Sequence, residues 1–160
     1  MSVLSRSCAA PVRTPRPRQL TVLAGVAVLA VASAGCLKAE EQTFLDRTNA
    51  LRTSQGVDAL SDHDTLNQKA ELWARHMAET GVLAHSQVSQ SLEGLSWQLL
   101  GENVGVTSAR TDPLRALHDG FAGSPSHQAN LLNQRFDHMG VGVAESADGR
   151  VWVVEVFADL

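Results

Sequence analysis

Three side chains in the second half of the chain could carry acid–base or metal chemistry. They are His85 in the stretch LAHS, Glu102 in GENV and His127 in SPSH. Two neutral imidazoles and a carboxylate are ligand types that Zn²⁺ accepts, and a water could fill the fourth position. Without a metal, the same groups form a His–Glu pair able to move protons. Because 17 and 25 residues separate them along the chain, only tertiary folding can bring them together.

Each of these residues also has a plain structural explanation when it is taken alone. His127 could simply lie in the first turn of a helix, Glu102 could accept hydrogen bonds at a helix start, and His85 could be a surface residue. The other four histidines, His63, His76, His118 and His138, are expected on loops or exposed helix surfaces.

Composition and motifs exclude several classes of protein. The chain has no G-x-S-x-G, no HExxH and no phosphate-binding glycine-rich loop, and its only cysteines are Cys8 and Cys36. After Cys36 there are 17 acidic residues against nine basic ones (13 minus the four arginines before it), which argues against nucleic acid as a partner. With 44% apolar and 19% charged residues, the chain is expected to fold, without a disulfide in the folded part.

Residues 1–36 have the features of an export signal. Arginines up to Arg18 precede 13 apolar or small residues at 20–32, and the Ala-Ser-Ala that ends this region suits a signal peptidase. Thirteen helical residues cover roughly 20 Å, too short for a bilayer core of about 30 Å. A second interpretation takes the sequence SAGC as a lipobox, with Cys36 as a lipidated N-terminus, although Ser33 replaces the usual Leu. A freely secreted protein and a lipid-anchored one both remain open.

Hydrophobic spacing predicts helices first and strands last. Spacings of three and four continue through the first part of the mature chain, whereas alternation begins after residue 138, with Asp148-Gly149 as the turn of a hairpin. The expected elements are a polar tether at 37–42, helices from 43 to Gly56 and from Asp62 or Asp64 to Gly81, a long loop at 83–101, helices at 112–121 and 126–133, and strands at 139–144 and 151–157. Helices packed on an antiparallel sheet make an α+β fold.

Few aromatic residues are available for the core. Only 4% of the chain is aromatic and it has no Tyr, so Leu, Val and Ala must supply most of the buried surface. Trp73 follows Ala70 and precedes Met77 on the expected inner face of its helix, which predicts a buried anchor. The full set of expected aromatic anchors is Trp73, Trp97, Phe121, Phe136, Trp152 and Phe157.

Several motifs in order resemble the CAP superfamily of cysteine-rich secretory, antigen 5 and pathogenesis-related 1 proteins, also called SCP-like, in its bacterial extracellular form. They are TNALR, WARHM, LAHS, GENV, SPSH followed by ANLLN, GVGV and a final strand ending in VF, and together they cover roughly residues 43–158. The resemblance implies an α-β-α sandwich with an open cavity lined by two histidines and acidic residues, where some members bind a divalent metal. His85, Glu102 and His127 fall on the matching positions, and they are expected to bind a ligand together with Asn103.

The sequence departs from the family pattern at two places. Animal members carry a second Glu shortly before the second His, and this chain has none there, so Asp119 and Glu155 are the candidates to replace it. The bacterial form SPGHRANLL becomes SPSHQANLL, which puts neutral Gln128 where a cation is usual and weakens the case for an anionic ligand.

Three functions follow from the resemblance and the residues together. The leading hypothesis is a monomeric, secreted or cell-surface binding module, with His85 and His127 as metal ligands, Zn²⁺ or another divalent ion as cofactor, and a lipid or cell-wall-derived molecule in the cavity. The rival is a metal-dependent hydrolase of peptide or peptidoglycan that uses His85, Glu102 and His127. The third is a scaffold for a protein partner, in which the histidines only hold the long loop in place.

Overall fold

A computed structural model describes residues 38–92 and 94–160, and the predicted export signal and lipidated Cys36 lie outside them. No helix within these two ranges is long and apolar enough to cross a membrane. The elements, in chain order, are helix α1 (Ala39–Ser54), strand β1 (Ser61–Asp62), helix α2 (Asp64–Thr80), the 3-10 turn η1 (Val88–Ser91), strand β2 (Leu99–Thr107), helices α3 (Pro113–Gly123) and α4 (Pro125–Leu131), and strands β3 (His138–Glu145) and β4 (Val151–Asp159).

The four strands form one sheet in the order β1-β3-β4-β2. Strand β4 runs antiparallel to both β3 and β2, and the two-residue β1 adds a short parallel pair to β3. The α+β prediction is confirmed, and the sheet is mixed only through β1. Strand β2 therefore lies at one edge of the sheet, which matters for the site described below.

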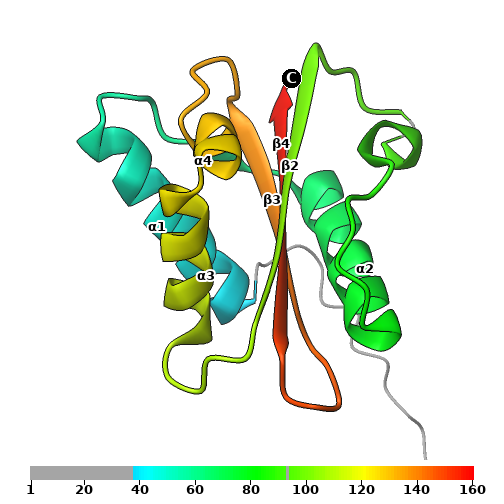
Figure 1. The fold of residues 1–160 in the computed structure, drawn as a ribbon. Coiled ribbons are helices and arrows are strands. Elements are labelled where there is room, and N and C mark those ends of the chain that lie inside the picture. The colour runs from blue at the N-terminus through cyan, green and yellow to red at the C-terminus, as the bar shows by residue number, and fades with distance from the viewer. Residues whose placement is uncertain (1–37, 93) are drawn as a thin grey trace, which may run out of the picture. The chain divides into compact units, whose positions relative to one another are not determined.

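Helices cover both faces of the sheet (Figure 1), with α1, α3 and α4 on one face and α2 on the other. Strand β4 is buried on both sides because its residues alternate between two cores. Val153 and Phe157 pack with α1, α3 and α4, whereas Trp152 and Val154 pack against α2. This explains why the sequence of β4 is an almost continuous apolar run.

Two glycines of β3 allow α2 to lie directly against the sheet. A Cβ atom at Gly140 would come within 2.1 Å of the Leu66 carbonyl carbon, and one at Gly142 within 2.2 Å of the Ala70 carbonyl carbon. Both contacts are with helix backbone, which cannot rotate away as a side chain would. The sequence GVGV is thus required by the close packing of α2 on β3.

Three predictions about the elements need correction. Residues 39–42 belong to α1 instead of a tether. The Lys38 N–H donates to the Glu41 carboxylate at 3.0 Å and so caps the first turn of the helix. The predicted loop at 83–101 contains η1 and the first residues of β2. Strand β2 escaped detection because its three consecutive polar or glycine residues, Gly101, Glu102 and Asn103, hide the alternation expected of a strand.

Two aromatic residues and one histidine are placed differently from expectation. Trp97 is 41% exposed, and Trp73 is only half-buried at the edge of the α2 core, so neither is a central anchor. His118 is buried instead of lying on the helix surface: its ring packs edge-on against Phe44 at 5.6 Å, and burial lowers its pKa. The exposed position expected for His76 is confirmed.

Candidate functional site

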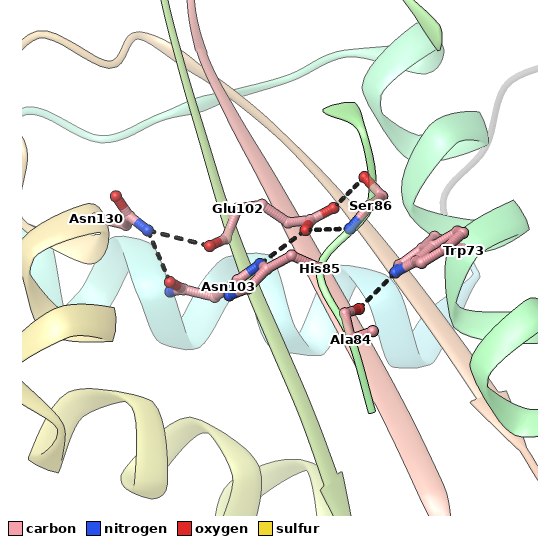
Figure 2. A network of polar contacts seen from close by, with 7 residues as sticks. All are labelled: Trp73, Ala84, His85, Ser86, Glu102, Asn103 and Asn130. Carbon is pink, nitrogen blue, oxygen red and sulfur yellow. Dashed lines mark hydrogen bonds and ion pairs between the residues drawn. The ribbon is translucent and has the colours of Figure 1, made fainter. Parts of the chain in front are cut away.

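Strand β2 presents consecutive side chains to opposite faces of the sheet. Asn103 faces the layer of α3 and α4, where its amide donates to the Glu155 carboxylate of β4 at 2.9 Å. Glu102 points to the α2 face, where it meets the segment that follows α2. Figure 2 shows the two groups of polar contacts that result, one on each side of β2.

The carboxylate of Glu102 fixes the orientation of His85. Its Oε1 accepts hydrogen bonds from Nδ1 of His85 and from the backbone N–H of Ser86, both at 2.8 Å, and its Oε2 accepts one from the Ser86 hydroxyl. A carboxylate only accepts, so His85 carries its proton on Nδ1 and leaves the lone pair of Nε2 free. The Glu102 side chain is 5% exposed and the His85 side chain 62%, so the imidazole is held from behind and projects into solvent.

Helix α2 positions the segment that carries His85. Gly81 ends the helix in the left-handed conformation, with φ of 70°, and the chain then turns back along the helix. The indole Nε1 of Trp73 donates to the Ala84 carbonyl at 2.8 Å and pins this segment one residue before His85 (Figure 2). Lys69 of α2, itself buried, has a lowered pKa because of burial, opposed by the nearby Glu102 carboxylate.

His127 lies on the opposite face of the sheet from His85, in the first turn of α4. Its Nδ1 is 2.9 Å from the Ser124 hydroxyl, and its ring centroid lies 4.9 Å from that of Phe121. Burial lowers the pKa of His127, and the positive charge that His85 can carry lowers it further. Leu83, two residues before His85 in the chain, lines the same groove along the outer edge of β2 as His127 does.

A buried amide network fastens α4 to β2. The Asn103 amide also contacts the His127 carbonyl at 3.3 Å, and the Asn130 amide donates to the Asn103 side-chain oxygen at 2.9 Å and to the Glu102 carbonyl at 3.2 Å. Asn103 is fully buried, and both polar atoms of its side chain are used. It acts as a support for the site, since its side chain has no free group to offer a ligand.

A groove of about 290 Å³ runs along the outer edge of β2 beside His127. Residues 104–107 of β2 form one wall and α3 the other, with Leu83, Ser124 and His127 completing the lining. The groove is mostly apolar, and its lining includes no Lys, Arg, Asp or Glu among the described residues.

The donor atoms allow a partial metal site. His85 offers Nε2, and His127 retains Nε2 because its Nδ1 faces Ser124. Glu102, predicted as part of the trio, has both carboxylate oxygens occupied by His85 and Ser86, so it orients His85. Within the residues that the structure describes, no group of three or more His, Cys, Asp or Glu side chains is arranged to hold a metal. Among these described residues, Nε2 of His85 and Nε2 of His127 are the candidate donor atoms.

Neither proposed substitute for the second family glutamate reaches the groove. The Asp119 side chain is 66% exposed and lies 3.6 Å from Arg115 one turn away. Glu155 is fully buried and accepts from the Thr48 hydroxyl at 3.0 Å as well as from Asn103. Gln128 is exposed and donates to the Ala122 carbonyl at 2.9 Å, within the turn between α3 and α4.

Sequence reasoning identified His85, Glu102, Asn103 and His127 but missed three residues that hold them. Ser86 and Asn130 stand inside the motifs LAHS and ANLLN beside more conspicuous neighbours, and Trp73 was assigned to the core. In the sequence, Ser86 and Asn130 are marked only as polar residues near a candidate residue. The supporting role of all three residues becomes visible only when the strand and the loop are placed.

Comparisons with known proteins agree with this architecture. The chain is 28% identical over 123 residues to the protein YkwD of Bacillus subtilis (strain 168), covering 72% of this chain and 46% of that protein, so it spans less than half of this relative's length. The fold matches an outer surface protein from Borrelia burgdorferi with a TM-score of 0.67 at 20% identity, over 76% of this chain and 92% of the other.

A second solved structure, an extracellular protein containing an SCP domain from Bacillus anthracis str. Ames, gives a TM-score of 0.66 at 23% identity, over 79% of this chain and 45% of the other. The model of the cysteine-rich secretory protein family, CAP, matches residues 45–157. With that match covering most of its length, the chain belongs to the CAP family.

Proposed function

We propose that the protein acts outside the cell as a binding module in which His85 and His127 hold a divalent cation at the edge of β2, next to a groove for a second ligand. One observation carries the proposal: Glu102 fixes the His85 tautomer so that Nε2 keeps its lone pair and points into solvent. A carboxylate behind a histidine is the common arrangement for a metal-binding imidazole. When bound, Zn²⁺ would supply a positive charge that attracts carbonyl or carboxylate oxygens.

The extracellular location is supported by the predicted export signal, by membership of a family described as secretory, and by the relative described as extracellular. A lipid anchor at Cys36 remains one of two forms of this proposal. The apolar lining of the groove is compatible with a lipid or cell-wall-derived ligand.

The site favours binding over hydrolysis. A metal-dependent hydrolase needs a carboxylate that is free to take a proton from the attacking water. Both oxygens of Glu102 are already used by His85 and Ser86. In the described part of the chain, Asp119 and Glu155 do not line the groove either.

Calorimetric titration with Zn²⁺ at pH 7.5 and pH 5.5 tests the proposal. We expect one site at pH 7.5, lost in both His85→Ala and His127→Ala. Both imidazoles must be neutral to bind zinc, so protonation should weaken binding at pH 5.5 by about 100-fold if both rings compete and by about 10-fold if one does. The lowered pKa of His127 keeps its ring neutral to lower pH, so we expect the smaller loss.

His63→Ala is the matched control, because His63 follows β1 at the opposite edge of the sheet and its ring contacts that of His138 at 5.6 Å. Zinc binding that survives the loss of both His85 and His127, or that disappears in His63→Ala, would contradict the assignment. Turnover of peptide or peptidoglycan by the unaltered protein, lost in His85→Ala, would favour the hydrolase instead.

A further inference from the structure

The outer edge of β2 carries backbone groups that point away from the sheet. At the β3–β4 turn, the Ser146 N–H donates to the Arg150 carbonyl at 2.9 Å. In an antiparallel pair every second residue bonds to the same neighbour, so the even-numbered residues of β4 bond to β3. The odd-numbered residues of β4 therefore bond to β2. The register pairs Val153 with Gly105 and Val151 with Thr107. The N–H and C=O groups of Glu102, Val104 and Val106 are therefore directed outward.

Among the residues that the structure describes, only Glu102 of these three has a partner for its outward backbone groups. The Glu102 carbonyl accepts from the Asn130 amide at 3.2 Å, which confirms the direction of the edge. Within residues 38–92 and 94–160, no backbone or side-chain group hydrogen-bonds to the backbone of Val104 or Val106 on that side. Leu83 lines the same groove, but its segment forms no strand pair with β2 in the described ranges. Two residues thus offer donors and acceptors spaced for another strand.

The groove along this edge offers an apolar surface beside the free backbone groups. Its volume of about 290 Å³ lies beside the free backbone, between β2 and α3. On the α3 side the wall includes Gly120, beside which a Cβ atom would meet nothing within 4 Å. On the other side Leu83, Val104 and Val106 present apolar surface. Alternate side chains of a bound strand would face these two walls.

The lining also restricts the charge of the occupant. Among the described residues it contains no Lys, Arg, Asp or Glu, and its one titratable group is His127. Away from the cation proposed at the His127 end, a charged side chain in this groove would lose water without gaining an opposite charge, so a segment with neutral side chains fits best.

We propose that this edge binds an extended peptide segment with small or aliphatic, uncharged side chains, which adds a strand to β2 along Val104–Thr107. The segment lies between Leu83 and α3 and passes His127 at the end of the groove. Backbone hydrogen bonds give the affinity, and the apolar walls select the side chains. This inference names the ligand class for the groove and so rests on the proposed function.

The experiment uses the full chain, labelled with ¹⁵N, and the probe acetyl-Ser-Val-Ala-Val-Ser-amide. We expect saturable shifts of the Val104 and Val106 amides and slower hydrogen exchange at both. A second probe has the same side chains but carries N-methyl groups on the two amides that would face β2. Loss of two net hydrogen bonds predicts binding weaker by about 10-fold or more.

A matched pair of glycine variants tests the location. Gly120→Leu fills the groove from α3 and should abolish binding, whereas Gly123→Leu, on the same helix and equally open but outside the lining, should leave it unchanged. Thermal unfolding of both variants confirms that they fold. Val106→Pro removes the outward N–H of residue 106 without removing a hydrogen bond to β4. Val106→Ala, which keeps that N–H, is its control.

Each outcome decides the inference. Equal affinity for the two probes, equal effects of the two leucine variants, or no binding at millimolar concentration of the first probe would overturn it. Concentration-dependent protection of Val104 and Val106 without any probe would show that a second copy of the chain occupies the edge, and would also overturn it. Zinc titration of Gly120→Leu separates the two proposals, because His85 and His127 are intact in that variant and zinc affinity should be unchanged.

Discussion

The buried carboxyl of Glu155 makes a sharp prediction about pH and stability. It is fully buried in β4, with the Thr48 hydroxyl and the Asn103 amide as its hydrogen-bond partners. Burial raises its pKa from 4.5 to about 7, against the opposing effect of those two bonds. Because the pKa of Glu155 is raised in the folded state, proton binding at this carboxyl stabilises the fold. This contribution to the free energy of unfolding is fully present below pH 4.5 and is lost as the pH rises to about 7.

The size of the effect follows from the shift. A rise from 4.5 to about 7 corresponds to about 3 kcal/mol of stability lost between those pH values. Glu155→Gln keeps the shape and cannot ionise: its amide can donate to the Thr48 hydroxyl and its oxygen can accept from Asn103. We expect the variant to match the unaltered protein near pH 4.5 and to exceed its free energy of unfolding by up to about 3 kcal/mol at pH 8.

Urea unfolding of both proteins at pH 4.5, 6 and 8 measures this difference, and other titrating groups cancel because both proteins contain them. A difference between the two proteins that stays constant from pH 4.5 to pH 8 would refute the reasoning, since it would mean that Glu155 titrates alike in the folded and unfolded chain. A thermal scan at pH 8 in which Glu155→Gln melts lower would refute it equally.

Three further predictions concern packing, the site and the N-terminus. Gly140→Ala should cost about 3 kcal/mol or more because its Cβ would clash with the backbone of α2, while Gly123→Ala, which meets nothing within 4 Å, should leave urea unfolding unchanged or slightly improved. Trp73→Phe keeps the ring but loses the bond to the Ala84 carbonyl, so it should cost about 0.5–1.5 kcal/mol and weaken zinc binding; unchanged zinc affinity would show that the His85 segment is held by other contacts. Mass spectrometry of the exported protein should find a chain that starts at Gly35, or a lipidated one that starts at Cys36, and an intact Met1 would contradict the export signal.

The helices and the β3–β4 hairpin could be predicted from the sequence because local rules determine them. Gly81 adopts the left-handed conformation that ends α2, Asp112 and Pro113 begin α3, and the apolar stripe of Leu66, Ala70 and Met77 faces the sheet as its spacing indicates. These features depend on residues a few positions apart, where periodicity and capping are informative.

The placement of the site required tertiary information. Nothing near Glu102 indicates that it lies on an edge strand, because β2 gains its strand conformation from pairing with β4, some 50 residues later in the chain. The motifs predicted His85, Glu102 and His127 as site residues, but they could not show that other side chains occupy the Glu102 carboxylate. The hydrogen bonds from Ser86 and His85 that occupy it come from a segment 16 and 17 residues away. Trp73 showed the apolar spacing of a core residue, yet its indole reaches the Ala84 carbonyl at the surface.

We propose that His85 and His127, held on opposite faces of β2, form one cation site around its edge. A crystal structure of the mature protein grown with Zn²⁺, with anomalous diffraction measured at the zinc absorption edge, tests it most directly. The account predicts a single strong peak about 2.0–2.1 Å from Nε2 of both histidines, with His85 Nδ1 still bonded to Glu102. A peak bound to Glu102 in place of His85, or zinc found only at other histidines, would contradict it.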